Sequence, residues 1–197
     1  AAPAAMAHTT AVAAVASVLS YVFLVAAVLV IMVVLVSGLT AMMQHGLQEQ
    51  ATPSIWMLIP IITLLGIEWI RMEHGLAHLF GSEANAASSF QMLTLLFSLQ
   101  AIMLLLGYRV MKLNGYLANY LHGDSRSPVS FGLVCPGVAF FVMGVFWWHV
   151  GVVNTGLVAK FGLVYWMGMA TMVAVQMLTI YAFVRLTRNL LQHRELV

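Results

Sequence analysis

Charged residues are scarce in this chain of 197 residues, because Asp, Glu, Lys and Arg together make up only 7% of it. A soluble domain is typically about 25% charged, so the composition excludes an ordinary soluble fold. The net charge of +2 is small and scattered, and it gives no reason to expect a nucleic-acid partner. Cys135 is the single cysteine, which excludes an intramolecular disulfide and a thiolate metal cluster.

Long apolar segments take the place of the missing charge. Hydrophobic residues make up 62% of the chain, and its mean hydropathy is +0.98. Crossing a bilayer takes about 20 apolar residues in a helix. We therefore predict an all-α fold, a polytopic membrane helical bundle that forms a single transmembrane domain over residues 1–197. Its five transmembrane helices are expected at about 11–43, 54–80, 88–112, 128–159 and 161–184.

Prolines fall inside two of these five segments. Pro60 lies in the second segment, and Pro136, followed by Gly137, lies in the fourth. A proline inside a helix removes one backbone hydrogen bond and kinks or breaks the helix. Broken helices are tolerated at membrane depth where they line a cavity. The two proline-kinked helices are therefore expected to line a cavity or pathway, with the other three packed around them.

Four ionisable side chains share one face of the second segment. Wound at about 100° per residue, Glu68, Arg71, His74 and His78 fall within a stripe about 120° wide. Ionisable groups in a membrane normally face a protein interior or a water-filled cavity, so the stripe is a candidate binding site or pathway wall. Glu68 and Arg71 are three residues apart, which predicts a buried ion pair. The alternative is that these polar residues only hold neighbouring helices in register.

The segment 53–60, with the sequence PSIWMLIP, resembles the proline-broken helix of the tellurite-resistance/dicarboxylate transporter family. This family includes plant slow anion channels, bacterial tellurite-resistance proteins, and fungal malate and sulfite exporters. The resemblance covers about residues 53–190. It implies inner helices, kinked by prolines, around a central pore of ten helices, of which this chain corresponds to the last five. A gating phenylalanine near the proline of the ninth helix implies that role for Phe131 or Phe140.

The resemblance implies a transporter-like or channel-like membrane protein for a small anion, with half of a larger pore in this chain. Arg71 would supply positive charge, and Glu68 or the histidines would handle protons. Further membrane subunits or an oligomer are the expected partners, together with the lipid bilayer. The chain departs from the family in carrying a charged stripe on an inner helix. No catalytic residues, cofactor or metal are expected, so the chain is not expected to be an enzyme.

A b-type haem subunit of a redox complex is the rival interpretation. A haem could bind between His74 or His78 on the second segment and His149 on the fourth. His74 and His149 lie about equally deep in their segments, which favours this pairing. His149 follows two tryptophans, however, and such a histidine is also typical of an interfacial anchor. A third interpretation is an accessory subunit of a membrane complex with no chemistry of its own.

Basic residues set the expected orientation. The side opposite the predicted C-terminus carries only Lys160. By the positive-inside rule the C-terminus is expected in the cytoplasm and the N-terminus outside, most simply in a bacterial inner membrane. The residues that define the cytoplasmic side are Arg109, Lys112, Arg126, Arg185, Arg188 and Arg194.

Overall fold

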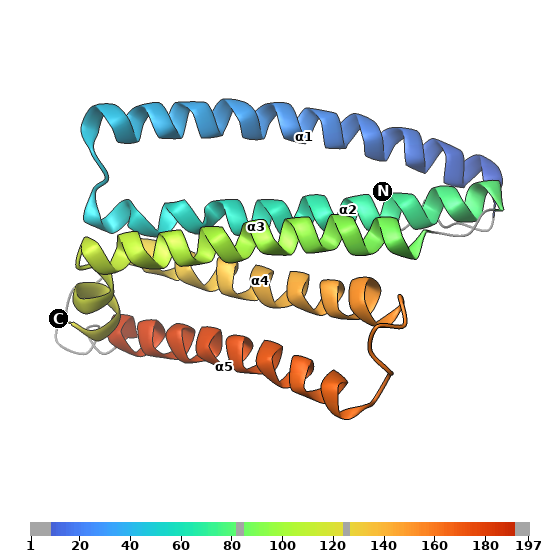
Figure 1. The fold of residues 1–197 in the computed structure, drawn as a ribbon. Helices are drawn as coiled ribbons and strands as arrows, with labels where there is room; N and C mark the ends of the chain where they lie inside the picture. The colour runs from blue at the N-terminus through green and yellow to red at the C-terminus, as the bar shows by residue number, and fades with distance from the viewer. Residues whose placement is uncertain (1–8, 82–84, 124–126, 192–197) are drawn as a thin grey trace. The chain divides into compact units, whose positions relative to one another are not determined.

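The computed structural model describes residues 9–81, 85–123 and 127–191, without the side chains of Gln50 and His122 (Figure 1). Helices account for 89% of the structure, and the described ranges contain no strand. Five helices are long and apolar enough to cross a membrane by length and composition. The prediction of an all-α chain with five such helices is confirmed. Arg126 and Arg194, two of the residues used to predict the orientation, lie outside the described residues.

The described chain contains five α-helices and four short segments of other helical geometry. The long helices are α1 (Thr10–His45), α2 (Leu58–Phe80), α3 (Ala86–Leu113), α4 (Val134–Phe146) and α5 (Leu163–Leu191). The short segments are the 3₁₀-helices η2 (Glu49–Met57) and η4 (Pro128–Leu133), and the π-helices η3 (Leu117–His122) and η5 (Trp147–Val153). The fourth candidate span, Pro128–Val153, joins η4, α4 and η5.

The chain divides into two compact units, and the first comprises Ala1–Leu47 and Leu64–Asn85. It contains α1 and the later part of α2. Helix α1 has no Asp, Glu, Lys or Arg along its 36 residues. Four of its residues are buried, and all four have small side chains, which allow close approach of a neighbouring helix backbone. The buried residues of α1 lie at spacings of three and four, which places them on one face: Ala13, Ala16, Ser17 and Ser20.

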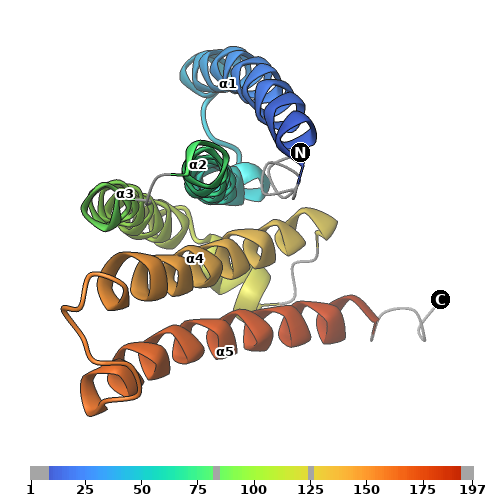
Figure 2. The ribbon, with the colours of Figure 1, turned by 90° about the vertical axis from the view of Figure 1, so that its right-hand side faces the viewer.

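The second unit comprises Gln48–Thr63 and Ala86–Val197. Within it, α4 runs antiparallel to both α3 and α5 and packs against both (Figures 1 and 2). Aromatic rings fill part of the space between α3 and α4. Phe97 stacks on Phe140 with ring centroids 5.0 Å apart, and on Trp147 with centroids 4.8 Å apart. These stacked rings fix the spacing of α3 against α4 and η5.

The connection between η5 and α5 begins earlier than the hydropathy of the sequence indicates. Residues 128–159 were expected to be one helix, but the helical geometry ends at Val153. Gly156 then adopts φ 78° and Phe161 adopts φ 63°, which are left-handed conformations that reverse the chain. Asn154 and Thr155 stand at the start of this turn, but the apolar residues 157–159 follow them, so hydropathy averaged over the segment does not mark it. Helix α5 conversely runs past 184 to Leu191. Its last turns are polar but still helical, which is why hydropathy predicted an earlier end.

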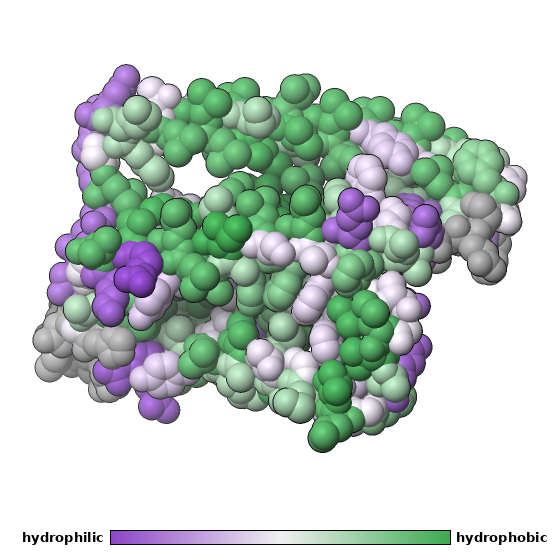
Figure 3. Space-filling model, in the orientation of Figure 1, coloured by the Kyte–Doolittle hydropathy of each residue, from purple (hydrophilic) through white to green (hydrophobic). Residues whose placement is uncertain are grey.

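Large apolar side chains are exposed along the helices of both units. Phe23 on α1 is 66% exposed, Leu105 on α3 is 66% exposed, and Met167 on α5 is 63% exposed. Figure 3 shows hydrophobic residues along α1 and along α3, whereas hydrophilic residues gather at the end where α3 and α5 finish. Such continuous apolar surfaces are rare on soluble monomers. They agree with a multi-pass membrane protein.

Candidate functional site

Both proline-containing helices begin as 3₁₀ segments and then change to α geometry. Pro53 lies inside η2, and Pro60 is the third residue of α2. Pro128 opens η4, and Pro136 is the third residue of α4. A proline is tolerated in the first turn of an α-helix because the N–H it lacks has no partner there. The two mid-segment prolines therefore stand where α geometry begins, rather than in the interior of an α-helix.

The two 3₁₀ segments pack against each other within the second unit. A Cβ placed on Gly132 of η4 would lie 4.0 Å from the Cβ of Pro53 in η2. The α-helices that follow therefore begin at the same end of this unit, which is also where α3 and α5 finish (Figure 1). The N-terminus of a helix carries a partial positive charge. Two such ends, at the starts of η2 and η4, and the basic residues near the ends of α3 and α5 give this end of the unit a positive character, which Glu49 in the first turn of η2 partly offsets.

We call α2 and α4 the proline-led helices, because Pro60 and Pro136 lie in their first turns. A buried hydrogen-bond network joins these two helices to α3. The Gln100 side-chain amide nitrogen donates to the Thr63 hydroxyl oxygen at 2.6 Å and to the Ile59 carbonyl at 2.9 Å. The Thr63 hydroxyl in turn lies 3.0 Å from the Ala139 carbonyl and 3.1 Å from that of Ile59, so its single proton is shared. We call Gln100, Thr63 and these two carbonyls the Gln100 network. It links α2, α3 and α4 at one depth.

Gln100 is fully buried, and its side-chain oxygen has no hydrogen-bond partner within the described ranges. The orientation of the amide follows from its neighbours, because a carbonyl only accepts and must face the NH₂ group. Sequence reasoning assigned the third segment to plain packing. A glutamine in the body of an apolar run was the signal that could have identified this residue, since such a side chain needs partners in a low-dielectric interior.

A tryptophan adds a second polar link between η2 and α3. The Trp56 indole N–H donates to the Leu104 carbonyl at 3.1 Å. Gly107, one turn further along α3, leaves space for this ring, because a Cβ there would collide with the Trp56 indole. The close approach of η2 to α3 therefore depends on a glycine.

The charged stripe of the second segment lies in the first unit and does not contain the expected ion pair. Arg71 is exposed, Glu68 is half-buried, and neither has a hydrogen-bond or ion-pair partner among the described residues. Residues three apart on a helix can meet, but an exposed guanidinium gains little from a pair. The prediction of a buried Glu68–Arg71 pair is therefore not met.

The two stripe histidines differ in their surroundings. The Nδ1 of His74 lies 2.8 Å from the Ile70 carbonyl. Because a carbonyl only accepts, Nδ1 carries the proton, and Nε2 of neutral His74 is left as an acceptor. His78 is exposed and has no hydrogen-bond partner among the described residues. Of the two, only His74 therefore has a hydrogen bond within the described part of the chain.

His149, the third histidine of the haem interpretation, lies in η5 of the second unit. Its Nδ1 lies 3.2 Å from the Val145 carbonyl, and its Nε2 lies 2.8 Å from the Tyr165 hydroxyl of α5. The arrangement is self-consistent when Nδ1–H donates to the carbonyl and Nε2 accepts from the tyrosine. Both ring nitrogens are therefore engaged, and His149 as placed has no nitrogen lone pair free for an iron atom. Within the described residues, no group of three or more His, Cys, Asp and Glu could hold a metal ion.

The two candidate gating phenylalanines occupy different environments. Phe140 is buried on α4, one turn after Pro136, and packs with Ile59 and Phe97. Phe131 belongs to η4 and meets Phe183 of α5 edge-on, with ring centroids 6.0 Å apart. Only Phe140 therefore packs directly between the two proline-led helices.

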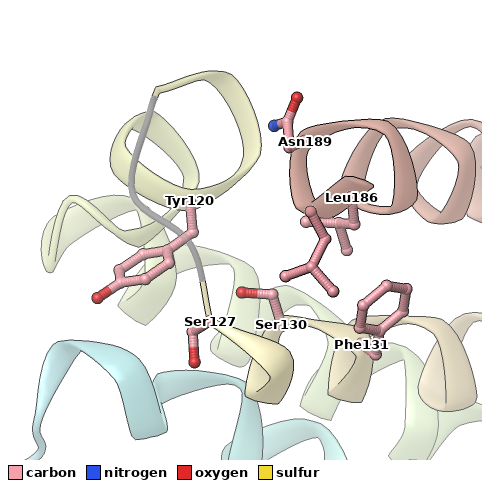
Figure 4. Close-up of a pocket in the computed structure, with 7 residues that line it drawn as sticks. Tyr120, Ser127, Ser130, Phe131, Leu186 and Asn189 are labelled. Atoms are coloured by element: carbon pink, nitrogen blue, oxygen red, sulfur yellow. The ribbon is translucent and has the colours of Figure 1, made fainter. Parts of the chain in front are cut away.

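Phe131 instead lines a small cavity between η3, η4 and α5 (Figure 4). The cavity measures about 10 Å³, which is roughly the room needed for one water molecule. Figure 4 shows Ser130 and Phe131 on one side and Leu186 and Asn189 on the other. The cavity is too small for any larger ligand.

Tyr116 is fully buried between α3 and η3, and it bonds Ser130, one of the residues that line this cavity. Its hydroxyl donates to the Ser130 hydroxyl at 2.8 Å, and its ring stacks on Tyr120 with centroids 4.9 Å apart. Burial raises the pKa of Tyr116 above its usual 10.0, the Ser130 hydrogen bond opposes that rise, and Tyr120 adds to it. The phenol therefore stays protonated at neutral pH and acts as a structural donor.

Comparison of the chain with protein-family models, with curated proteins and with solved structures gives no significant match. The fold by itself defines a class: an all-helical chain with five helices that have the length and composition of membrane spans. The resemblance to the tellurite-resistance/dicarboxylate transporter family stays a prediction.

Proposed function

We propose that the chain is an integral membrane protein whose five long helices cross the bilayer. The uncharged helix α1 and the exposed apolar side chains support insertion, because each exposed apolar Å² costs about 25 cal/mol in water. The described Lys and Arg residues of the second unit, apart from Lys160, lie in the last two turns of α3 and α5. By the positive-inside rule we propose that this end faces the cytoplasm, most simply at a bacterial inner membrane, with the N-terminus outside.

Within that membrane, we propose that the protein passes a small anion along its two proline-led helices, kinked at Pro60 and Pro136. The observation that carries this proposal is the packing of η2 against η4, which brings the N-terminal ends of two continuous helices, η2–α2 and η4–α4, together at the basic end of the unit. Anions are stabilised at helix N-termini and drawn to clustered cations. Further helices, from a second copy or another subunit, would complete the path.

Phe140 is the residue we propose as the constriction. It is buried between the two proline-led helices, beside Ile59 and one turn after Pro136. An aromatic ring in this place blocks passage, and its removal opens a cavity between the helices. Phe131 lies outside this contact and serves as the matched control.

The test is anion flux into vesicles that contain the purified chain. Phe140→Ala should raise chloride or nitrate flux several-fold over the parent, whereas Phe131→Ala should leave it near the parent level and potassium flux should stay at background. If neither the parent nor Phe140→Ala exceeds protein-free vesicles, the transport proposal fails. An absorbance spectrum of the same preparation decides the alternative, because a Soret band would identify a haem b protein and would require His149 to give up its bond to Tyr165.

A further inference from the structure

A hollow of about 450 Å³ opens on the second unit among η2, α3, η3, α4 and α5. Its volume falls within the roughly 300–1,000 Å³ of ordinary ligand sites. Its walls are almost entirely apolar, with Leu104 and Leu105 from α3 and Leu178 and Ala182 from α5. A hollow with these walls suits a hydrocarbon chain.

The few polar groups along the walls are already engaged. The Trp56 N–H donates to the Leu104 carbonyl, and the Thr179 hydroxyl donates to the Val175 carbonyl at 3.0 Å. Only Tyr108, which lines the hollow towards the end of α3, offers a hydroxyl that is not already bonded within the described residues. A polar solute would therefore find almost no partners inside, because burying an unpaired polar group is costly.

Cations continue the two walls beyond the hollow. Lys112 follows Tyr108 by four residues on α3, and Arg185 follows Ala182 by three residues on α5, so each lies close to the face that lines the hollow. Both are exposed, and neither has a hydrogen-bond or ion-pair partner in the described part of the chain. Figure 1 shows that α3 and α5 finish at the same end of the unit, and Figure 3 shows hydrophilic residues gathered there.

We propose that this hollow binds one acyl chain of an anionic phospholipid whose phosphate is held by Lys112 and Arg185. The apolar walls exclude a free anion from the hollow, and a neutral lipid would leave the two cations uncompensated. Guanidinium and ammonium groups are the usual partners of phosphate oxygens. Basic pockets at the cytoplasmic ends of membrane helices are suited to anionic headgroups. The proposal rests on membrane insertion but does not depend on anion transport.

The test uses the full chain purified in a mild, uncharged detergent, with thermal unfolding followed as lipid is added. Phosphatidylglycerol should raise the unfolding midpoint, whereas phosphatidylcholine and soluble glycerol phosphate should not. The double variant Lys112→Gln/Arg185→Gln should need about tenfold more phosphatidylglycerol for the same rise, while its midpoint without lipid stays unchanged. Lys160→Gln removes one positive charge at the opposite end and should behave like the parent.

A second variant tests the hollow itself. Ala182→Trp fills it, and it should abolish the effect of phosphatidylglycerol while the headgroup cations remain. Equal rises with phosphatidylcholine and phosphatidylglycerol would overturn the headgroup assignment, and a rise with glycerol phosphate alone would identify a free-anion site instead. If alkaline carbonate strips the chain from membranes, the insertion proposal fails; if the chain stays and shows no lipid selectivity, only the lipid site fails.

Discussion

The amide nitrogen of Gln100 lies 2.6 Å from the hydroxyl oxygen of Thr63, and both side chains are buried in the second unit. This hydrogen bond joins α3 to α2, and Thr63 passes the link on to the Ala139 carbonyl of α4 at 3.0 Å. A continuous series of hydrogen bonds therefore connects three helices near the start of α2 and α4. Removing either side chain takes one hydrogen bond from the other, although Gln100 keeps the Ile59 carbonyl and the Thr63 hydroxyl keeps the Ala139 and Ile59 carbonyls as partners.

Thr63→Val should lower the free energy of unfolding by about 1 kcal/mol, because it removes one of the two acceptors of the buried Gln100 amide nitrogen and the link to the Ala139 carbonyl. Gln100→Leu should cost a similar amount, and the double variant should cost less than the sum, because both polar partners are then gone. Denaturation in detergent measures these differences. Thr40→Val on α1 is the control, since the Thr40 hydroxyl bonds only the Val36 carbonyl of its own helix. Strict additivity of the two single changes would show that the network is not a coupled unit.

Gly107→Ala should destabilise the protein by about 1–3 kcal/mol, which is typical of overpacking. The added methyl group would collide with the Trp56 indole and push it from the Leu104 carbonyl. The control is Gly38→Ala in α1, where a Cβ meets nothing within 4 Å and the better helix propensity of alanine should be neutral or stabilising by up to about 1 kcal/mol. Thermal unfolding of both variants measures the contrast. If Gly107→Ala behaved like Gly38→Ala, the η2–α3 contact would not be close.

Alkaline pH should destabilise the protein through Tyr116. Its folded pKa is raised above 10.0 by burial, so the folded protein holds this proton more tightly than the unfolded chain does. The corresponding stabilisation is fully present below about pH 10, and it is lost as the pH rises through the raised folded pKa. Tyr116→Phe should remove this part of the pH dependence, and Tyr120→Phe should leave most of it. Unfolding midpoints between pH 8 and 11 provide the measurement, and an unchanged profile in Tyr116→Phe would contradict the assignment.

Glu68→Gln and Arg71→Gln should have independent effects on stability. The structure forms no ion pair between these side chains, and Arg71 is exposed. Residues without shared partners usually give additive changes. Expression level and thermal stability of the two single variants and the double variant decide the matter. A clear coupling between the two changes would restore the buried pair that the sequence predicts.

Apolar length alone predicts the five long helices, because membrane-scale hydrophobic runs are the strongest signal in a sequence. The ends of the fourth and fifth helices were less predictable. The turn after Val153 contains Asn154 and Thr155, but the apolar residues 157–159 follow, and the left-handed Gly156 and Phe161 reverse the chain. The last turns of α5 are polar, so hydropathy ended that helix at 184 instead of Leu191.

Side-chain partners were the part that the sequence could not supply. Helical spacing placed Glu68 and Arg71 on one face, but spacing does not decide whether two side chains meet. Gln100 was visible as a polar residue in an apolar segment, yet its partner Thr63 is 37 residues away and is brought close only by packing. His149 was identified as a candidate ligand, whereas its bond to Tyr165 depends on the antiparallel packing of α4, which continues into η5, against α5.

Pro60 and Pro136 occupy equivalent places, each as the third residue of an α-helix that follows a 3₁₀ segment. Thr52 and Ser127, both hydroxyl residues, precede the first proline of the two segments. The helices η2–α2 and η4–α4 thus share one local pattern, in which a 3₁₀ segment precedes an α-helix with proline at its third residue, and α3 separates them in the chain. Each substitution at one proline then has a natural replicate at the other, within a single polypeptide.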